Sequence, residues 1–266
     1  MTDEPSPDVT GADPPGPAGW RVELGSDHRP AYYAARPGFW RDWWNLLHPP
    51  YTAWHLAYVV IGASLAPHVD LTRLVATLLA FFFAVGLAAH ALDELQGRPL
   101  RTQIPAPMLV GSATVGLAGA VALGVAGLSR VGWPLIPFLV VGPVLVIAYN
   151  LELFGGIVHT DAGFAVAWGA FPVLTAYVGQ TGRLAPSAVL AAASAFALST
   201  AQRQLSTPAR LVRRRATHVE GRIVVGEGDS VRIDERTLLG PLEQALRAVS
   251  WGVVLLAGSL AAARLG

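Results

Sequence analysis

The sequence predicts an all-α integral membrane protein: a polytopic helical bundle of about seven transmembrane helices, with a small cytoplasmic β-hairpin loop between the last two. Hydrophobic residues make up 53% of the 266 residues and charged residues only 14%, whereas about a quarter of the residues in soluble proteins are charged. Apolar windows long enough to cross a hydrocarbon core of ~30 Å as a helix recur along the chain. Helices are required because lipid satisfies no backbone polar group.

The apolar windows define the expected order of the bundle. They cover residues 51–67, 71–93, 106–129, 131–150, 160–180, 185–203 and 243–264. Many of them carry Gly and Ala at close spacing, which lets helix backbones approach closely in a membrane. The transmembrane bundle is therefore expected over residues 51–266.

Two segments precede the bundle. Residues 1–36 are rich in Pro, Gly and acidic residues and contain no apolar block, which predicts a disordered tail. Residues 37–50 are dense in Trp and are punctuated by Arg, Asp and His. Because tryptophan rings suit the headgroup zone of a bilayer, this segment is expected to form an amphipathic helix on the membrane surface.

The distribution of arginine predicts the orientation. All 19 basic residues are Arg, and most of them lie on the same side as the N-terminus if each window crosses the membrane once. The positive-inside rule then places the N-terminus in the cytoplasm. A chain rich in Ala, Gly, Pro and Arg and without Lys is typical of a GC-rich bacterial genome. The expected location is therefore the bacterial cytoplasmic membrane.

Two missing residue types exclude several classes of chemistry. The chain has no Cys, which excludes disulfides, zinc fingers, iron–sulfur clusters and thiol nucleophiles. It also has no Lys, which excludes Schiff-base chemistry and a P-loop, because both need a lysine amine. No nucleic-acid partner is expected.

The connection at residues 204–241 is the substantial soluble element expected on the cytoplasmic side. Its alternating runs GRIVV and SVRID flank the turn-forming GEGD, which predicts a β-hairpin. The preceding Arg213–Arg215 run fits either a phosphate-binding site or a topology determinant that touches anionic lipid. The second interpretation is favoured because such runs are common.

Acidic residues are scarce within the bundle and converge on its cytoplasmic side. Between Thr72 and His218 the only acids are Asp93, Glu94, Glu152 and Asp161, and each stands at the predicted cytoplasmic end of a window. Histidines accompany them at the same ends. We therefore expect one cytoplasm-facing polar cavity lined by His55, His90, Asp93, Glu94, Asn150, Glu152, His159 and Asp161.

Each of these acids alone also fits a plainer role. Asp161 fits a helix cap, and Asp93 fits an ion pair with Arg98 or Arg101. Together with the imidazoles, however, they supply the oxygen and nitrogen ligands that a divalent metal ion needs. The expected metal ligands are His90, Asp93, Glu94, Glu152, His159 and Asp161.

Three segments in this order resemble the UbiA-like intramembrane prenyltransferase superfamily: LLHPPYTAWHLAYVVIGA, AHALDELQGRPLRTQIP and AYNLELFGGIVHTDAGFAVAWGAFPVL. The resemblance covers roughly residues 45–210. It implies a helical bundle in which two aspartate motifs hold Mg²⁺ ions that grip a prenyl diphosphate. On that basis the expected catalytic residues are Asp93, Glu94, His90 and Asn150, and the expected substrate-binding residues are Arg98, Arg101, Tyr149, Arg203 and Arg210.

The chain departs from this family at both aspartate motifs. In the first motif, His90 stands at the place of the first aspartate and Gly97 at the place of the third, so that Asp93 is the aspartate that remains. In the second motif, Gln204 and Pro208 stand at the aspartate places. One whole carboxylate set of the two-motif arrangement is therefore missing.

Two functions from different classes follow. The first is a divergent membrane enzyme that acts on a prenyl diphosphate or other isoprenoid lipid, by prenyl transfer or terpene cyclisation, with Mg²⁺ as cofactor. The alternative is a non-transferase membrane metalloprotein that holds Fe, Zn or Mn in the His and carboxylate cluster, or a lipid-binding or partner subunit on the same scaffold. The expected partners are an isoprenoid or other lipophilic substrate and membrane lipids, and in the alternative also a partner subunit.

Overall fold

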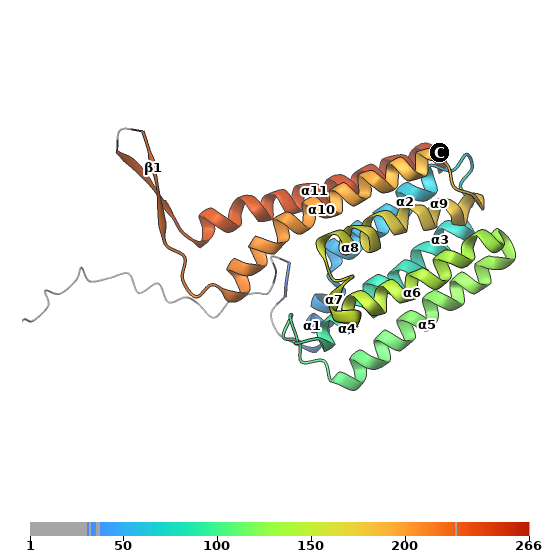
Figure 1. The fold of residues 1–266 in the computed structure, drawn as a ribbon, viewed down its shortest axis with the longest axis horizontal. Helices are drawn as coiled ribbons and strands as arrows, with labels where there is room; N and C mark the ends of the chain where they lie inside the picture. The colour runs from blue at the N-terminus through green and yellow to red at the C-terminus, as the bar shows by residue number, and fades with distance from the viewer. Residues whose placement is uncertain (1–30, 32, 36–37, 227, 266) are drawn as a thin grey trace, which may run out of the picture.

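The computed structural model describes residues 31, 33–35, 38–226 and 228–265, and in it the chain is a bundle of helices with one projecting β-hairpin (Figure 1). The predicted helical class and the hairpin are confirmed. The tail predicted over residues 1–36 falls almost entirely outside the described residues.

A short helix, α1 (Phe39–Leu47), lies where the sequence predicts a surface helix over residues 37–50. The remaining helices are α2 (Pro49–Ser64), α3 (Leu71–Phe81), α4 (His90–Leu95), α5 (Ala106–Val131), α6 (Ile136–Asn150), α7 (Leu153–Gly156), α8 (Asp161–Ala165), α9 (Phe171–Thr181), α10 (Pro186–Arg215) and α11 (Glu235–Leu265). Two π-helical segments join neighbours without a break: η1 (Phe82–Ala89) joins α3 to α4, and η3 (Val166–Ala170) joins α8 to α9. A short 3-10 helix, η2 (Trp133–Leu135), leads into α6.

Every predicted apolar window coincides with a helix, but fewer helices have the length and apolar composition of a membrane span. Among the described residues there are 5 such helices: Leu71–Leu95, Ala106–Val131, Trp133–Asn150, Asp161–Thr181 and Glu235–Leu265. Helix α2 has only 16 residues, and the second half of α10 carries several arginines. The structure therefore fits a multi-pass membrane protein, while a count of seven crossings stays a prediction.

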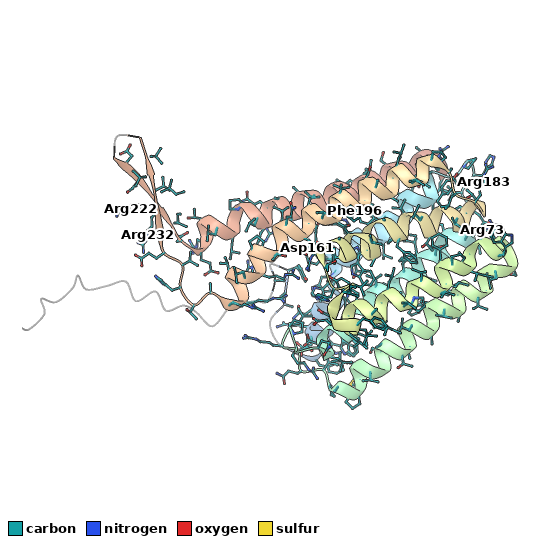
Figure 2. The ribbon with its side chains drawn as sticks, in the orientation of Figure 1. Arg73, Asp161, Arg183, Phe196, Arg222 and Arg232 are labelled. Carbon is teal, nitrogen blue, oxygen red and sulfur yellow. The ribbon has the colours of Figure 1, made fainter. Side chains whose placement is uncertain are left out.

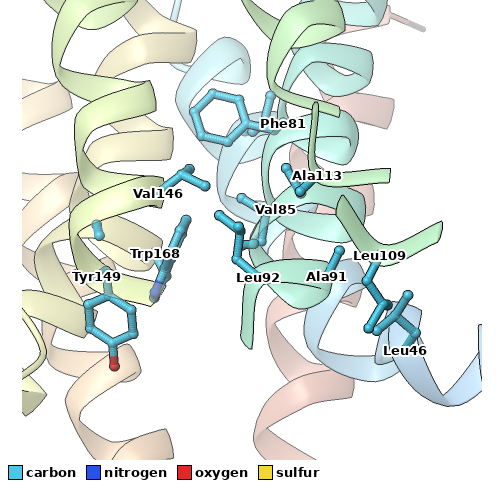
Figure 3. Packing of buried hydrophobic residues seen from close by; sticks show 14 of the residues in the cluster. Leu46, Phe81, Val85, Ala91, Leu92, Leu109, Ala113, Val146, Tyr149 and Trp168 are labelled. Atoms are coloured by element: carbon cyan, nitrogen blue, oxygen red, sulfur yellow. The ribbon is translucent and has the colours of Figure 1, made fainter. Parts of the chain in front are cut away.

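The helices are arranged in three layers (Figure 1). Helices α10 and α11 form a long antiparallel pair on one side, drawn in orange and red. Helix α2 and the continuous helix α8–η3–α9 form the middle layer, and α3–η1–α4 packs with α5 and α6 on the other side. A buried apolar cluster that includes Phe81, Val85, Val146 and Trp168 joins the middle layer to this outer layer (Figure 3).

Glycines allow backbones of different layers to touch. A Cβ on Gly62 of α2 would lie 2.3 Å from the Val173 carbonyl oxygen of α9, and a Cβ on Gly169 of η3 would lie 2.7 Å from the Ala195 carbonyl oxygen of α10. Side chains at either position would therefore push the layers apart. Contacts of this kind are common between membrane helices, where close packing stabilises association.

Within the connection predicted over residues 204–241, both flanking helices extend beyond the apolar windows. Helix α10 continues through Arg215 and α11 already begins at Glu235. The physical reason is that the two helices go on packing against each other beyond the apolar windows, where Arg213 pairs with Glu243 and Leu239 and Leu246 are buried.

The predicted β-hairpin consists of β1 (Gly221–Val225) and β2 (Asp229–Ile233). The strands are antiparallel, with Arg222 opposite Arg232 and Ile223 opposite Val231. The hairpin projects beyond the paired ends of α10 and α11 (Figure 2).

The contact of Gly62 with α9 makes a testable prediction. Gly62→Ala is expected to lower stability by about 1–3 kcal/mol because the added methyl group overpacks a backbone contact. Thermal unfolding of the detergent-solubilised protein measures this. Gly252→Ala in α11 is the matched control, because nothing lies within 4 Å of its added Cβ. Unchanged or raised stability of Gly62→Ala would contradict the close contact of α2 with α9.

Candidate functional site

A polar cavity of about 190 Å³ lies among α2, α4, η3, α10 and α11. Five of the residues expected in a shared cavity line it: His55, His90, Asp93, Asn150 and His159. Tyr149, Arg203 and Arg210, which are expected to bind substrate, also line it. Residues from widely separated parts of the chain therefore meet in one chamber, as the sequence predicts.

Both π-helical segments border this cavity. Val85 of η1 and Trp168 of η3 line it. A π-helical turn loosens the regular hydrogen-bond ladder and is frequent at functional sites. Here the Trp168 carbonyl accepts a hydrogen bond from Nδ1 of His55 at 2.8 Å. His90 directly follows η1, so the irregular turn sets the direction in which its side chain leaves the helix.

Three histidines have the same ring nitrogen fixed. Nδ1 of His55, His90 and His159 each lies within hydrogen-bonding distance of a backbone carbonyl, at 2.8, 3.2 and 2.9 Å. A carbonyl only accepts, so each Nδ1 carries the hydrogen, and in the neutral ring Nε2 carries a lone pair. The cavity thus contains imidazole nitrogens that can accept a hydrogen bond or a proton from a bound group.

His48 adds a fourth imidazole. It stands between α1 and α2, and its ring centroid lies 4.6 Å from that of His90. The Tyr33 hydroxyl is hydrogen-bonded to its Nδ1. Burial, followed by the positive fields of His90, Arg214 and Arg210, holds the pKa of His48 well below its ordinary value. His48 is therefore neutral at pH 7.

Helix α10 supplies the positive charge of the cavity. Arg203, Arg210, Arg213 and Arg214 all line it, and their spacings of three, four and seven residues keep them on one side of the helix. Nε of Arg203 lies 2.9 Å from the Asp161 carboxylate, and Arg213 pairs with Glu243. Arg203 and Arg213 are thus each neutralised by a carboxylate.

Arg210 differs from these neighbours. Its side chain is half-buried, its nearest recorded polar contact is the Thr207 hydroxyl on its own helix at 3.3 Å, and it forms no ion pair with any carboxylate of the described residues. Burial, and then the charges of Arg203 and Arg214, lowers the pKa of Arg210. An arginine nevertheless stays charged at neutral pH. Among the described residues, the cavity therefore presents a guanidinium group that forms no ion pair with a carboxylate.

Glu94 lies away from the cavity, so the structure does not bring it together with Asp93. Its carboxylate is fully buried and accepts hydrogen bonds from the backbone N–H of Leu100 at 3.0 Å and from the backbone N–H and hydroxyl of Thr102, both at 2.9 Å. Successive residues of a helix point in different directions, so Asp93 and Glu94 do not share a face. Glu94 fixes the segment that follows α4.

Glu152 and Asp161 also lie outside the lining of the cavity. The Glu152 side chain is 59% exposed, with Oε1 at 4.0 Å from Nε2 of His159. The Asp161 side chain, labelled in Figure 2, is 60% exposed, and its carboxylate pairs with Arg203. Each acid touches a residue of the lining without entering the cavity itself.

Arg98 and Arg101, expected to bind substrate, are likewise absent from the lining. Nη1 of Arg98 donates to the Ile104 carbonyl at 2.6 Å, and Arg101 is exposed. Both residues have a φ of 55°, a left-handed conformation that places them in tight turns. Their positions shape the loop between α4 and α5.

The described residues of the cavity do not form a cluster of metal ligands. In the part of the chain that the structure describes, no three His, Cys, Asp or Glu side chains come close enough together to hold one. The carboxylates of the lining are Asp93, whose charged neighbours include Arg214 and Arg210, and Glu243, which pairs with Arg213. These residues do not form a site in which the protein alone supplies the ligands of a metal ion.

An apolar chamber of about 250 Å³ adjoins the polar cavity, since Val85 and Trp168 line both. It lies between α3, α5, α6 and α9, and its walls include Phe81, Leu117 and Val146. Figure 3 shows Phe81 and Val85 facing Val146 and Trp168 across this region. The chamber extends along α3 to Thr72, which is roughly 20 Å of helix from Val85.

Several residues of the lining were not expected from the sequence: Tyr33, His48, Tyr51, Gln202 and Glu243. Arg213 and Arg214, for which the sequence left a phosphate-binding role open, also line it. Two signals were nevertheless present. His48 and His55 are two helical turns apart, and Arg203, Arg210 and Arg214 share one helical face. The shared face of the arginines can be recognised only if a helix is assumed to continue past residue 203, where the sequence predicts a loop.

Helices long and apolar enough to cross a membrane, together with a polar cavity, make this chain a helical protein that fits the multi-pass membrane class. Comparisons with protein-family models, with curated proteins and with solved structures find no match. The fold and the cavity therefore carry the functional argument.

The buried carboxylate of Glu94 makes a prediction about stability. Glu94→Ala is expected to lower the free energy of unfolding by about 3 kcal/mol, because it leaves two buried backbone N–H groups without an acceptor. Denaturant unfolding in detergent measures the change. Glu220→Ala, at a side chain that is 69% exposed, is the control and should have little effect. Equal effects of the two substitutions would contradict the structural role of Glu94.

His48 makes a prediction about pH. The pKa of His48 is lowered in the folded state. Below pH ~6.5 the unfolded chain therefore binds a proton at this histidine that the folded chain does not. As the pH decreases, the free energy of unfolding decreases by up to about 1.4 kcal/mol per pH unit. His48→Gln should make the decline of the melting temperature between pH 7.5 and pH 5.5 shallower. An unchanged slope would show that His48 is not held neutral in the fold.

Proposed function

We propose that this chain binds an isoprenoid or similar lipid that carries a phosphate or diphosphate head, and that it acts on this lipid as a divergent UbiA-like membrane enzyme. The head lies in the polar cavity and the apolar chain lies in the adjoining chamber. The proposal places the protein in the bacterial cytoplasmic membrane with its N-terminus and the polar cavity on the cytoplasmic side.

The observation that carries this proposal is the half-buried guanidinium group of Arg210, which forms no ion pair with any carboxylate that the structure describes. Removing a charge from water is costly unless an opposite charge compensates it. An anionic ligand would supply that compensation. Guanidinium groups bind phosphate oxygens with two parallel hydrogen bonds, which makes phosphate a well-matched anion.

The adjoining chamber supports a lipid rather than a soluble phosphate ester. Its lining is almost entirely apolar and begins at Val85 and Trp168, which also line the polar cavity. A ligand that crosses this boundary has a charged end and a long apolar end. An isoprenoid chain fits because it is flexible, apolar and long enough to occupy a chamber of this extent.

The imidazoles support an enzyme rather than a passive carrier. In prenyl transfer, the bond between the prenyl carbon and the diphosphate oxygen breaks, and the diphosphate leaves with the electron pair. The incoming nucleophile forms the new bond and gives up a proton. Nε2 of His55 or His90 is positioned to accept this proton, while the arginines of α10 hold the leaving group.

Binding of geranylgeranyl diphosphate tests the proposal. The purified protein in nanodiscs, with Mg²⁺ present, should bind the diphosphate at least about tenfold more tightly than geranylgeraniol, since only the diphosphate pairs with Arg210. Arg210→Gln should remove most of this preference. Isothermal titration calorimetry measures both affinities.

Arg222→Gln on the exposed hairpin is the matched control for the loss of one arginine charge. Equal affinities for the diphosphate and the alcohol, or an equal loss in both variants, would refute the proposed head site. If the diphosphate binds tightly but no inorganic diphosphate is released with any added acceptor, the chain is a lipid-binding subunit instead of an enzyme.

A further inference from the structure

We infer that Gln202 and His55 hold a water molecule in the polar cavity, and that this water attacks the prenyl carbon of the bound lipid diphosphate. The products are a prenyl alcohol and inorganic diphosphate. This inference rests on the proposed function, because it names the nucleophile of that reaction. Water takes the place of the organic acceptor that a prenyl transferase uses.

The side chain of Gln202 is buried with an unused hydrogen-bond acceptor. Gln202 lines the polar cavity and is only 7% exposed, and its Oε1 has no hydrogen-bond partner among the residues that the structure describes. A buried polar atom without a partner is costly, and a bound water often supplies the missing hydrogen bond. The terminal torsion of a glutamine is broad, so the amide can turn its oxygen toward the cavity. Gln202 therefore offers an acceptor to a group that donates a hydrogen.

Helix α2 brings His55 to the level of Gln202. Nε of Arg264 joins the C-terminal end of α11 to that of α2, so α2 runs in the same direction as α11 and opposite to α10. The Ser199 hydroxyl of α10 donates to the Tyr58 hydroxyl of α2 at 3.3 Å. One helical turn further toward the polar cavity, Gln202 follows Ser199 on α10 and His55 precedes Tyr58 on α2. Both residues line the cavity, so they lie at matching positions on two facing helices.

Together the two side chains present two acceptors to one bound group. Nδ1 of His55 is hydrogen-bonded to the Trp168 carbonyl at 2.8 Å, so Nε2 of the neutral ring accepts. A group that satisfies both Nε2 and the Gln202 oxygen needs two hydrogens, which water and amines have and a single alcohol hydroxyl lacks. The Arg210 guanidinium group lines the same cavity and repels a protonated amine. Water is therefore the group that fits.

The two acceptors lie where the reacting carbon of the lipid is expected. Arg210, which is proposed to hold the diphosphate, follows Gln202 by about 12 Å along α10. The apolar chamber for the lipid chain begins at Trp168, whose carbonyl holds the His55 ring. The carbon that joins the chain to the diphosphate lies between these two points and therefore next to His55 and Gln202.

The reaction is a hydrolysis at carbon. The oxygen of the water forms a bond to the prenyl carbon, the bond between this carbon and the diphosphate oxygen breaks, and the diphosphate leaves with the electron pair. One proton of the water passes to Nε2 of His55, and the other stays on the new alcohol. Gln202 takes no proton, because its role is to fix the direction in which the oxygen of the water faces the carbon.

The experiment incubates the full-length protein in nanodiscs with geranylgeranyl diphosphate and Mg²⁺ in oxygen-labelled water, without any organic acceptor. Mass spectrometry should find geranylgeraniol that carries the labelled oxygen, together with unlabelled inorganic diphosphate. Attack of water at the prenyl carbon leaves the label in the alcohol, whereas attack at phosphorus leaves it in the phosphate.

Variants separate the positioning of water from the binding of the lipid. Gln202→Leu should lower the rate of hydrolysis at least about tenfold, and His55→Gln at least about a hundredfold because the proton acceptor is lost. Both variants should keep the affinity for the diphosphate within about threefold, since Arg210 is unchanged. Gln204→Leu is the matched control: Gln204 lies on the same helix and is exposed, so its loss should leave the rate unchanged.

Three results would overturn the inference and leave the proposed function intact: binding of the diphosphate without formation of labelled geranylgeraniol, label in the phosphate, or an equal rate for Gln202→Leu and the wild-type protein. Failure of the wild-type protein to bind the diphosphate would overturn the proposed function itself. Because the labelling experiment needs only the wild-type chain, the test does not depend on the folding of any variant.

Discussion

A single constraint organises this molecule: helix α10 turns four arginines toward a polar cavity, and one of them, Arg210, forms no ion pair with a carboxylate of the described residues. Uncompensated charge in a partly buried site is costly, so the fold is consistent with a site that is completed by an anion. The arginines near the ends of this row are paired, with Asp161 from α8 and Glu243 from α11. These pairs hold α10 against its neighbours and leave Arg210 between them.

The rest of the bundle shapes the space on the other side of that charge. The π-helical segments η1 and η3 place Val85 and Trp168 at the boundary between a polar and an apolar chamber. Gly62 and Gly169 let α2 and η3 contact their neighbours at backbone distance, which fixes the layers around both chambers. Glu94 stabilises the loop after α4 from within, so that Asp93 and His90 are held at the end of a continuous helix.

The sequence was sufficient to predict the helical windows, the hairpin and the convergence of His55, His90, Asp93, Asn150 and His159, because apolar periods and the scarcity of acids are local signals. The sequence did not predict that Asp93 faces the cavity while Glu94 faces away from it. Adjacent helical residues point in different directions, and which of the two faces the cavity depends on how η1 packs. The sequence also ended α10 at residue 203, because a run of polar residues resembles a loop when its packing partner, the start of α11, is far away in the sequence. Arg203 and Arg210 were expected to bind substrate, but their place with Arg214 on one face of a continuous helix was hidden by that boundary.

The most direct test of the account is the position of a bound lipid. A geranylgeranyl diphosphate analogue with a photoreactive group on its terminal isoprene unit would be bound, cross-linked and located by mass spectrometry. The account predicts labelling of residues that line the apolar chamber, such as Leu117 of α5 or Phe138 of α6, and loss of that labelling when unlabelled diphosphate competes. Labelling confined to the outward surface of α11, at Trp251 or Leu255, would show that the lipid lies outside the bundle and would contradict the account.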